Sequence, residues 1–458
     1  MSLFSQQDDT IVALATPPGS GAIGVIRLSG PNAISIADQV FSGKTLSEQP
    51  SHTIHHGWIK DGDENLDEVL VSLFKAPKSY TKEDVIEISC HGSAYVIKAI
   101  IRLLVTGGAR LAKPGEFTLR AFLNGQMDLA QAEAVADLIA SESAATHQAA
   151  LNQMRGGISK EIKKLRQELI HFASMIELEL DFSEEDVEFA SREELKALVN
   201  NLLTVISPLI DSFQWGNAIK NGIPTVIAGR PNVGKSTLLN ALLNEEKAIV
   251  SEIPGTTRDF IEDEMVIEGI PFRFIDTAGL RDTEDTIEAL GIARTKEKME
   301  QASLILYLFD LSQATKEEIE ADVKQFTELG IPFLKIGNKT DTAQAELVAH
   351  FQKQPKVMLI SALQKENLDQ LKATILETVR PDDFKTGDTL VTSMRHYQSL
   401  QQTKKALDDV IAALDQKVTG DLLALDIRQA LHHLGEITGE ITTEDLLDNI
   451  FSKFCIGK

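Results

Sequence analysis

A glycine-rich segment has the residue types and the spacing of a phosphate-binding loop. Gly229-Arg-Pro-Asn-Val-Gly-Lys-Ser236 fits the pattern G-x-x-x-x-G-K-[ST] at every fixed position, after a short apolar run and before a helical one. Its glycines would let backbone N–H groups approach phosphate oxygens, Lys235 would reach the β- and γ-phosphates, and Ser236 would bind Mg²⁺. The segment predicts a nucleoside triphosphate site whose phosphate contacts are Asn232, Val233, Gly234, Lys235, Ser236 and Thr237.

Later segments complete this site and choose its base. In Asp276-Thr-Ala-Gly279, the Asp can hold Mg²⁺ and the Gly N–H can contact the γ-phosphate. In Asn338-Lys-Thr-Asp341, the carboxylate of Asp341 can accept from N1–H and the N2 amine of guanine, two donors that adenine lacks. A threonine between the first two motifs can complete the Mg²⁺ shell, and we assign Ser236 and Thr257 to it. The order of the segments predicts GTP, with further contacts at Thr256, Thr257, Asp276, Gly279, Asn338, Lys339, Asp341, Ser361 and Ala362.

The motifs do not reveal which residue promotes hydrolysis. Ras-type proteins place a water-orienting Gln directly after D-x-x-G, and this chain has Leu280 there. Another group must therefore position the attacking water and neutralise charge. Each charged residue nearby also fits a solvated loop charge, so the residues alone select none among Arg258, Arg281, Asp282, Glu284 and Glu288.

Composition limits the class of protein. Lys and Arg total 45 against 68 Asp and Glu, a formal net charge of −23, which is unlike a basic, nonspecific nucleic-acid binder. A nucleic-acid partner would need a local basic patch or a basic partner protein. The two cysteines, Cys90 and Cys455, imply no disulfide framework and fit a reducing compartment. Because no apolar run approaches the roughly 18 residues of a bilayer span and no secretory signal opens the chain, we expect a cytoplasmic protein without a membrane partner.

The elements that must position these residues suggest about three domains in 458 residues. Residues 1–119 mix strands with helices, which predicts an α+β domain. The stretches 120–215 and 381–458 are nearly free of proline and show helical spacing of apolar residues, which predicts one all-α domain. Residues 216–380 alternate apolar runs with helical patterns. We therefore predict a multidomain fold, α/β plus α, with a Ras-like α/β G domain inserted into the helical domain.

The motifs resemble those of a known family. GRPNVGKS, IPGTTRD, DTAGLRD and NKTD, with a hydrophobic residue after D-x-x-G, resemble the Era-like GTPases of the TRAFAC class. The flanking segments Lys113-Pro-Gly-Glu-Phe, Asp128-Leu-Ala-Gln-Ala-Glu-Ala and Cys455-Ile-Gly-Lys458 resemble the MnmE (TrmE) family of GTPases that modify uridine 34 of tRNA. The resemblance covers essentially the whole chain, and its most specific parts are the C-terminal tetrapeptide and the Pro-Gly-Glu-Phe block.

The resemblance implies a K⁺-dependent, dimeric GTPase. In this family the G domains dimerise across the nucleotide, and a K⁺ ion supplies the charge that an arginine finger would otherwise supply. The water-orienting glutamate falls on Glu288, and Cys455 falls on a cysteine needed for modification but not for GTP hydrolysis. The family's K⁺ ligands fall on Asn232, Ser251, Ile253 and Thr256. Ser251 is also expected to contact the nucleotide.

The resemblance also implies a folate cofactor and partners. The N-terminal unit resembles folate-binding domains and dimerises, so the homodimer would carry 5-formyl- or methylene-tetrahydrofolate on Arg27, Glu87, Gln126 and Lys458. Gln126 departs from the basic residue expected there. Gly19–Gly24 matches G-x-G-x-x-G but continues as a strand, so we interpret it as a loop, not a dinucleotide site. A FAD-containing MnmG-family protein would join the chain in a heterotetramer or larger complex, which installs a carboxymethylaminomethyl-type group at C5 of wobble uridine 34.

Two other classes of function stay open at this stage. An Era-like switch GTPase in ribosome or RNA assembly would use the same nucleotide motifs without modification chemistry, and the two most specific segments argue against it. A nucleotide-gated scaffold with negligible turnover would hydrolyse GTP equally slowly in K⁺ and Na⁺.

Overall fold

The computed structural model describes most of the chain, namely residues 9–181, 191–244, 263–275, 302–313, 315–352, 357–379, 389–416, 418 and 420–457. These residues belong to two compact units. The first contains Met1–Ile139, Leu151–Ile206 and Gln398–Lys458, and the second contains Ala140–Ala150 and Ser207–Tyr397. None of the described helices combines the length and the apolar character needed to cross a bilayer.

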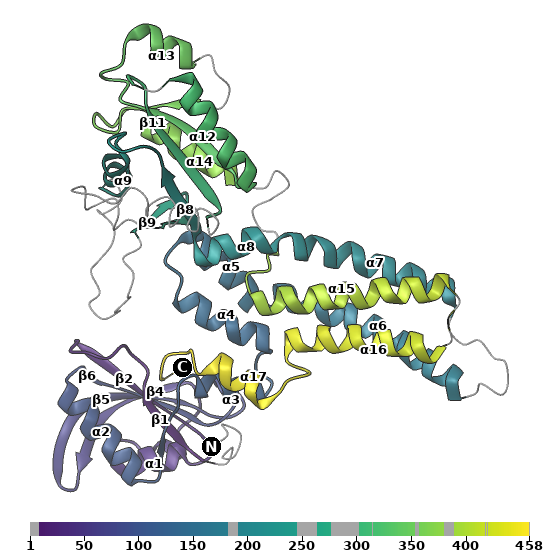
Figure 1. The fold of residues 1–458 in the computed structure, drawn as a ribbon. Helices are drawn as coiled ribbons and strands as arrows, with labels where there is room; N and C mark the ends of the chain where they lie inside the picture. Colours follow the sequence, from purple (N-terminus) through teal and green to yellow (C-terminus); the bar gives the residue numbers. More distant parts are fainter. Residues whose placement is uncertain are drawn as a thin grey trace. The chain divides into compact units, whose positions relative to one another are not determined.

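The first unit begins with a mixed sheet that two helices cover on one face (Figure 1). Its elements are β1 (Ile11–Leu14), β2 (Ile23–Ser29), α1 (Ala33–Val40), β3 (Phe41–Ser42), the 3₁₀ turn η1 (Leu46–Glu48), β4 (Thr53–Asp61), β5 (Glu64–Phe74), β6 (Val85–His91), α2 (Ala94–Thr106), β7 (Arg110–Leu111) and α3 (Glu116–Leu123). The strands lie in the order β3-β4-β5-β6-β2-β1-β7. Alternation along β5 buries Val69, Val71 and Leu73 against α1 and α2, whereas Leu70 stays exposed on the opposite face.

Long helices form the rest of the first unit. Its elements are α4 (Leu129–Ile139), α5 (Ala144–Met154), α6 (Gly157–Asp181), α7 (Arg192–Asp211), α15 (Met394–Asp415), α16 (Gly420–Thr438) and α17 (Glu444–Phe451), and α5, α7 and α15 are each shared with the second unit. Helices α6 and α16 lie side by side although about 250 residues separate them (Figure 1), and Arg428 of α16 pairs with Glu177 of α6 at 2.7 Å. The two helical stretches therefore pack together, as the sequence predicts.

The second unit is a three-layer α/β domain. Its elements are α8 (Phe213–Asn221), β8 (Ile223–Ala228), α9 (Lys235–Asn244), β9 (Asp263–Ile267), β10 (Ile270–Phe274), β11 (Leu304–Asp310), α12 (Lys316–Leu329), β12 (Phe333–Asn338), α13 (Ala345–Gln352), β13 (Val357–Leu359) and α14 (Leu368–Val379). The strands lie in the order β13-β12-β11-β8-β10-β9, and within this sheet only the β9–β10 pair among the described strands is antiparallel. Along β11, Leu306 and Leu308 face α9 and α14, whereas Tyr307 and Phe309 face α12 and α13.

The architecture confirms the predicted fold class. An α+β N-terminal part is followed by a helical part whose two stretches flank the α/β domain in the sequence. Strands buried on both faces, such as β11, are continuous apolar runs because helices cover both sides of a parallel sheet. Residues 19–22 lie in the connection between antiparallel β1 and β2, and Ile23 and Gly24 begin β2, so the segment joins two strands, as interpreted from the sequence. The exact boundaries at residues 119, 215 and 380 stay predictions.

Candidate nucleotide-binding site

The nucleotide motifs follow strands that end at one edge of the parallel sheet. β8 ends at Ala228, directly before Gly229, and α9 begins at Lys235. β12 ends at Asn338, and β13 is followed within two residues by Ser361. Because β8, β11, β12 and β13 are parallel, their carboxyl ends share one edge of the sheet, where open α/β sheets bind ligands.

The phosphate-binding loop has a backbone that only glycine accommodates at two positions. Gly229 has φ +150°, and a Cβ there would lie 2.2 Å from the carbonyl oxygen of Leu308. Gly234 has φ +99°, and its Cβ would lie 2.4 Å from Nδ2 of Asn338. Between them Asn232 also has a positive φ, of +63°. The two glycines of the motif are therefore required by close packing against β11 and β12 as well as by backbone conformation.

One buried amide joins the phosphate-binding and base-selecting segments. Asn338 is 3% exposed, and its Nδ2 donates to the carbonyl of Val233 at 2.9 Å. Its Oδ1 accepts from the backbone N–H of Ala362 at 3.0 Å. A buried group that loses such a partner is left unsatisfied, at about 1–3 kcal/mol each. The side chain of Asn338 thus holds three sequence-predicted segments in one arrangement.

The side chain that would select guanine is oriented by a buried hydroxyl. Oγ of Ser361, which is fully buried, donates to Oδ1 of the exposed Asp341 at 2.6 Å. The backbone N–H of Ala362, one of the predicted GTP contacts, donates to Asn338 in this structure, so a guanine oxygen would have to share that donor. The predicted base contacts therefore lie together, with Asp341 at the surface of the sheet edge.

Lys235 points back into its own loop. Its Nζ donates to the carbonyl oxygens of Gly229 at 2.7 Å and Arg230 at 2.9 Å, and burial lowers the pKa of its amine. A phosphate oxygen is a stronger acceptor for an ammonium than a carbonyl is. Ser236 and Thr237 follow in the first turn of α9, where the helix dipole favours an anion.

Sequence reasoning missed Asp310, at the end of β11. Asp310 is 6% exposed. Its carboxylate accepts from Nζ of Lys339 at 2.8 Å, and from the hydroxyl and the backbone N–H of Ser312 at 2.6 and 2.9 Å. The same Nζ of Lys339 donates to the carbonyl of Asn232 at 2.9 Å. Burial opposes the charged carboxylate, but these hydrogen bonds outweigh it and hold the pKa of Asp310 below its usual value. The sequence did contain one signal for this residue, because Asp310 is a carboxylate directly after the apolar run of β11.

Several predicted site residues lie outside the described residues. They are the predicted K⁺, Mg²⁺, γ-phosphate, water-orienting and terminal folate residues Ser251, Ile253, Thr256, Thr257, Asp276, Gly279, Glu288 and Lys458. The described strand β10 ends at Phe274, two residues before Asp276, at the edge of the sheet where β8 ends.

The predicted folate residues Arg27 and Glu87 face each other on neighbouring strands. They are cross-strand partners on β2 and β6, and Nε of Arg27 donates to Oε1 of Glu87 at 2.8 Å. The guanidinium also lies 5.6 Å from the ring centre of Tyr80 and 5.7 Å from that of Phe117. Its Nη1 donates to the carbonyl of Gly457 at 3.3 Å, so the C-terminal tail reaches this face of the sheet.

The two most specific sequence segments meet at this tail. The N–H of Gly115, within the Pro-Gly-Glu-Phe block, donates to the carbonyl of Cys455 at 3.4 Å, and the Cys455 thiol is free and exposed. Gly457 has φ +95°, and a Cβ there would lie 2.2 Å from the carbonyl of Leu14. Gln126 is exposed in the turn after α3 and donates its N–H to Ala121 at 2.8 Å.

Comparison with known proteins gives full-length relatives. A family model described as "MnmE helical domain" matches residues 129–455, and one described as "GTP-binding protein TrmE N-terminus" matches residues 10–126. A protein of Cytophaga hutchinsonii named "tRNA modification GTPase MnmE" is 62% identical over 450 residues, covering 98% of each chain. A protein of the same name from Christiangramia forsetii is 54% identical over 474 residues, covering 98% of this chain and 99% of its own. Among solved structures, a point variant of Aquifex aeolicus Era bound to GDP·AlF4⁻ aligns with 27% identity and a TM-score of 0.27, covering 40% of this chain and 66% of that chain. The two family models and these relatives together account for nearly the whole sequence, and the chain belongs to the MnmE (TrmE) family.

Proposed function

We propose that this chain is a GTP-hydrolysing enzyme of tRNA modification. The observation that carries the proposal is the bridge made by Asn338, which joins the phosphate-binding loop to the segment that selects the base. Lys235, Ser236 and the start of α9 bind the phosphates and Mg²⁺, and Asp341 binds guanine. The relatives' shared name, tRNA modification GTPase, supports tRNA as the substrate that is modified.

Hydrolysis in this proposal needs a second copy of the chain and K⁺. Leu280 replaces the usual water-orienting residue, so Glu288 orients the water and K⁺ supplies positive charge. The backbone carbonyl of Asn232 is held by Lys339, which leaves its exposed side chain at the surface, where a cation between two copies could be bound. K⁺ is expected to stimulate GTP hydrolysis relative to Na⁺ in the wild type. Asn232→Ala should abolish the stimulation, and equally slow rates in both salts would support a scaffold without turnover.

The proposed folate site is the face of the sheet that carries Arg27 and Glu87. A guanidinium and a carboxylate side by side offer the donors and acceptors that match a pterin ring, and the rings of Tyr80 and Phe117 lie near the guanidinium. Lys82 donates to the carbonyl of Gly125 at 2.7 Å, next to Gln126. Lys82 therefore provides the cation for the glutamate tail of folate that position 126 lacks.

The homodimer in this proposal uses the same sheet. Ile54 and Leu70 point outward on β4 and β5 and are 66% and 47% exposed, and Trp58 lies on the same face at 39%. Contact with a second copy would remove this apolar surface from water. A FAD-containing MnmG-family protein is the proposed partner for the modification of C5 of uridine 34. The two free cysteines, buried Cys90 and exposed Cys455, fit a cytoplasmic setting.

Nucleoside analysis of tRNA tests the proposed function. A deletion strain should lack the modified wobble uridine, and the wild-type gene should restore it. Gly457→Ala should fail to restore it while the purified variant keeps its GTPase rate, because a Cβ would displace the tail from Leu14. Unaltered wobble uridines in the deletion strain would instead favour an Era-like switch in RNA assembly.

A further inference from the structure

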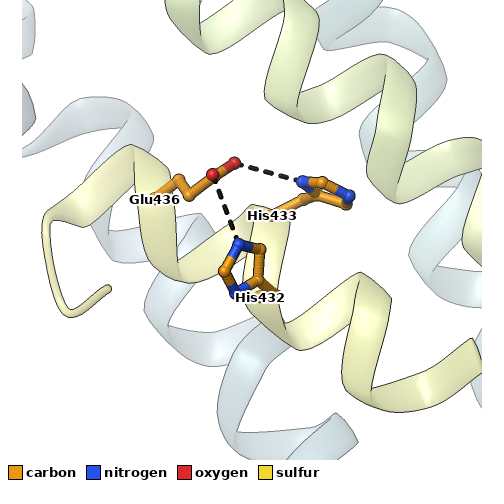
Figure 2. A group of neighbouring side chains, drawn as sticks. All are labelled: His432, His433 and Glu436. Carbon is orange, nitrogen blue, oxygen red and sulfur yellow. Dashed lines mark hydrogen bonds and ion pairs between the residues drawn. The ribbon is translucent and has the colours of Figure 1, made fainter. Parts of the chain in front are cut away.

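Two histidines and a glutamate gather on one face of α16, outside the sites described above. His432 and His433 both face the carboxylate of Glu436 (Figure 2). Nδ1 of His433 lies 3.1 Å from Oε2, and Nε2 of His432 lies 3.4 Å from Oε1. Because residues three and four apart share a helix face, the spacing i, i+1 and i+4 lets both rings reach this carboxylate.

The separations between these atoms fit the coordination shell of one small ion. One ligand atom from each residue can be chosen so that all lie within 4.8 Å of one another. Ligand bonds of about 2.0–2.2 Å in a tetrahedral shell put neighbouring ligand atoms about 3.3–3.6 Å apart. Nε2 of His432 and Oε1 of Glu436 already have that separation, which is long for a hydrogen bond. Small rotations of the three side chains would bring the other ligand atoms to the same separation.

A buried hydroxyl on the neighbouring helix orients the carboxylate. Oγ of Ser399, on α15, donates to Oε2 of Glu436 at 3.3 Å, and Ser399 is only 7% exposed. Carboxylates that bind metals are themselves commonly hydrogen-bonded by such outer groups, which fix their orientation. The side chains of His432, His433 and Glu436 are 52%, 26% and 33% exposed, so an ion from solvent can reach them.

We propose that His432, His433 and Glu436 form a Zn²⁺ site. Two imidazoles and one carboxylate suit Zn²⁺ rather than Mg²⁺ or K⁺, which prefer oxygen ligands. Three protein ligands leave one position of a tetrahedral shell for water or for a group from another molecule. The site lies on the helical part of the first unit and differs in ligand chemistry from the Mg²⁺ and K⁺ positions proposed for the G domain.

Calorimetric titration of the full-length, chelator-treated chain with ZnCl₂, without nucleotide, tests the proposal. The wild type should bind one Zn²⁺ per chain through this site, and excess Mg²⁺ should not compete. His433→Gln and Glu436→Gln should each weaken binding at least tenfold, and Ser399→Ala should weaken it about tenfold through the outer contact. Cys455→Ser should retain the binding, which separates this site from the exposed thiol.

The chain offers a matched control in His56, whose Nε2 lies 2.8 Å from Oε1 of Glu68 on a more exposed surface, and no third metal-binding side chain joins this pair among the described residues. His56→Gln should leave Zn²⁺ affinity unchanged. Circular dichroism should confirm that the variants of α16 stay helical, as expected for exposed substitutions to Gln. Zn²⁺ binding that is unaffected by His433→Gln and Glu436→Gln, or no stoichiometric binding by the wild type, would overturn the proposal.

Discussion

Asp310 should act as a positioning residue for nucleotide binding, although no motif contains it. Its buried carboxylate holds Nζ of Lys339, which also donates to the carbonyl of Asn232 in the phosphate-binding loop. Asp310→Asn keeps the shape of the side chain but removes its charge. The Lys339 ammonium then loses its charged acceptor, so both the base-selecting and the phosphate-binding segments become less fixed.

The magnitude follows from the change in hydrogen-bond type. Hydrogen bonds to charged groups contribute about 1.5–3 kcal/mol and neutral ones about 0.5–1.5 kcal/mol. The difference is about 1–1.5 kcal/mol, and each 1.4 kcal/mol is tenfold in affinity, so the Kd for GDP should rise about 5- to 12-fold. Because the side chain of Lys339 is 34% exposed, solvent screening favours the lower end of this range.

Displacement of a fluorescent GDP analogue measures this effect at pH 7. Tyr307→Phe is the matched control, because it removes one hydrogen bond of a buried side chain in the same domain, the one that the Tyr307 hydroxyl donates to Asp322 at 2.7 Å. That control should lose stability without losing affinity. An unchanged Kd in Asp310→Asn, or an equal loss in both variants, would refute the positioning role.

The pH dependence has a definite sign. Since the folded-state pKa of Asp310 is lowered, its contribution to stability is present above the unfolded pKa of about 3.9 and is lost as pH falls through the folded value. The difference in unfolding free energy between wild type and Asp310→Asn should therefore be constant from pH 6 to 8 and shrink in acid.

Other predictions concern the loop, the sheet and an ion-pair cluster. Gly234→Ala should raise the Kd for GTP tenfold or more, because a Cβ at φ +99° meets Asn338, whereas Gly330→Ala, with φ +69° and no atom within 4 Å, should lower only stability; calorimetry and urea unfolding separate the two outcomes. Ile54→Glu should convert dimer to monomer in light scattering with little change in Tm, and a dimer that survives would exclude this face as the interface. For both Asp9 and Glu116, burial opposes the charged form, but hydrogen bonds and charge from neighbouring arginines outweigh it and lower the pKa. Their contribution to the free energy of unfolding is present above about pH 4 and is lost in acid. Urea unfolding between pH 5 and 3 should therefore show a steep fall in stability, and Asp9→Asn should make that fall smaller.

Local segments of the nucleotide site could be predicted because their chemistry is contained in short spacings. The phosphate-binding loop needs its glycines, lysine and serine within eight residues, and flanking apolar runs place it between a strand and a helix. Asp310 could not be assigned in this way, because its role depends on a strand register that pairs it with Asn338. Such a register arises from tertiary packing, which the local pattern of β11 does not specify.

The face that carries Arg27 shows the same limit over a greater distance. The sequence suggests Arg27 and Glu87 by resemblance, and the structure shows that they are hydrogen-bonded partners 60 residues apart. The contact with the carbonyl of Gly457 spans 430 residues, so no local pattern indicates it. The terminal Cys-Ile-Gly-Lys segment was recognisable as a motif, but the position of its Gly457 beside β1 depends on the packing of α17 and of Gly115.

The two sites therefore differ in how their residues should be coupled energetically. Asp310 and Asn338 are register partners that both act on the phosphate-binding loop, so their substitutions should be non-additive in GDP affinity by about 0.5–3 kcal/mol. Arg27 belongs to the first compact unit and Asp310 to the second. When the chain is free of nucleotide, the effects of substitutions at these two residues on the free energy of unfolding should therefore add within about 0.5 kcal/mol. If GTP binding drives tRNA modification through a change between the units, non-additivity between Arg27 and Asp310 should arise only with GTP bound. A double-mutant cycle measured with and without nucleotide distinguishes two units that are coupled by GTP binding from two sites that are energetically independent.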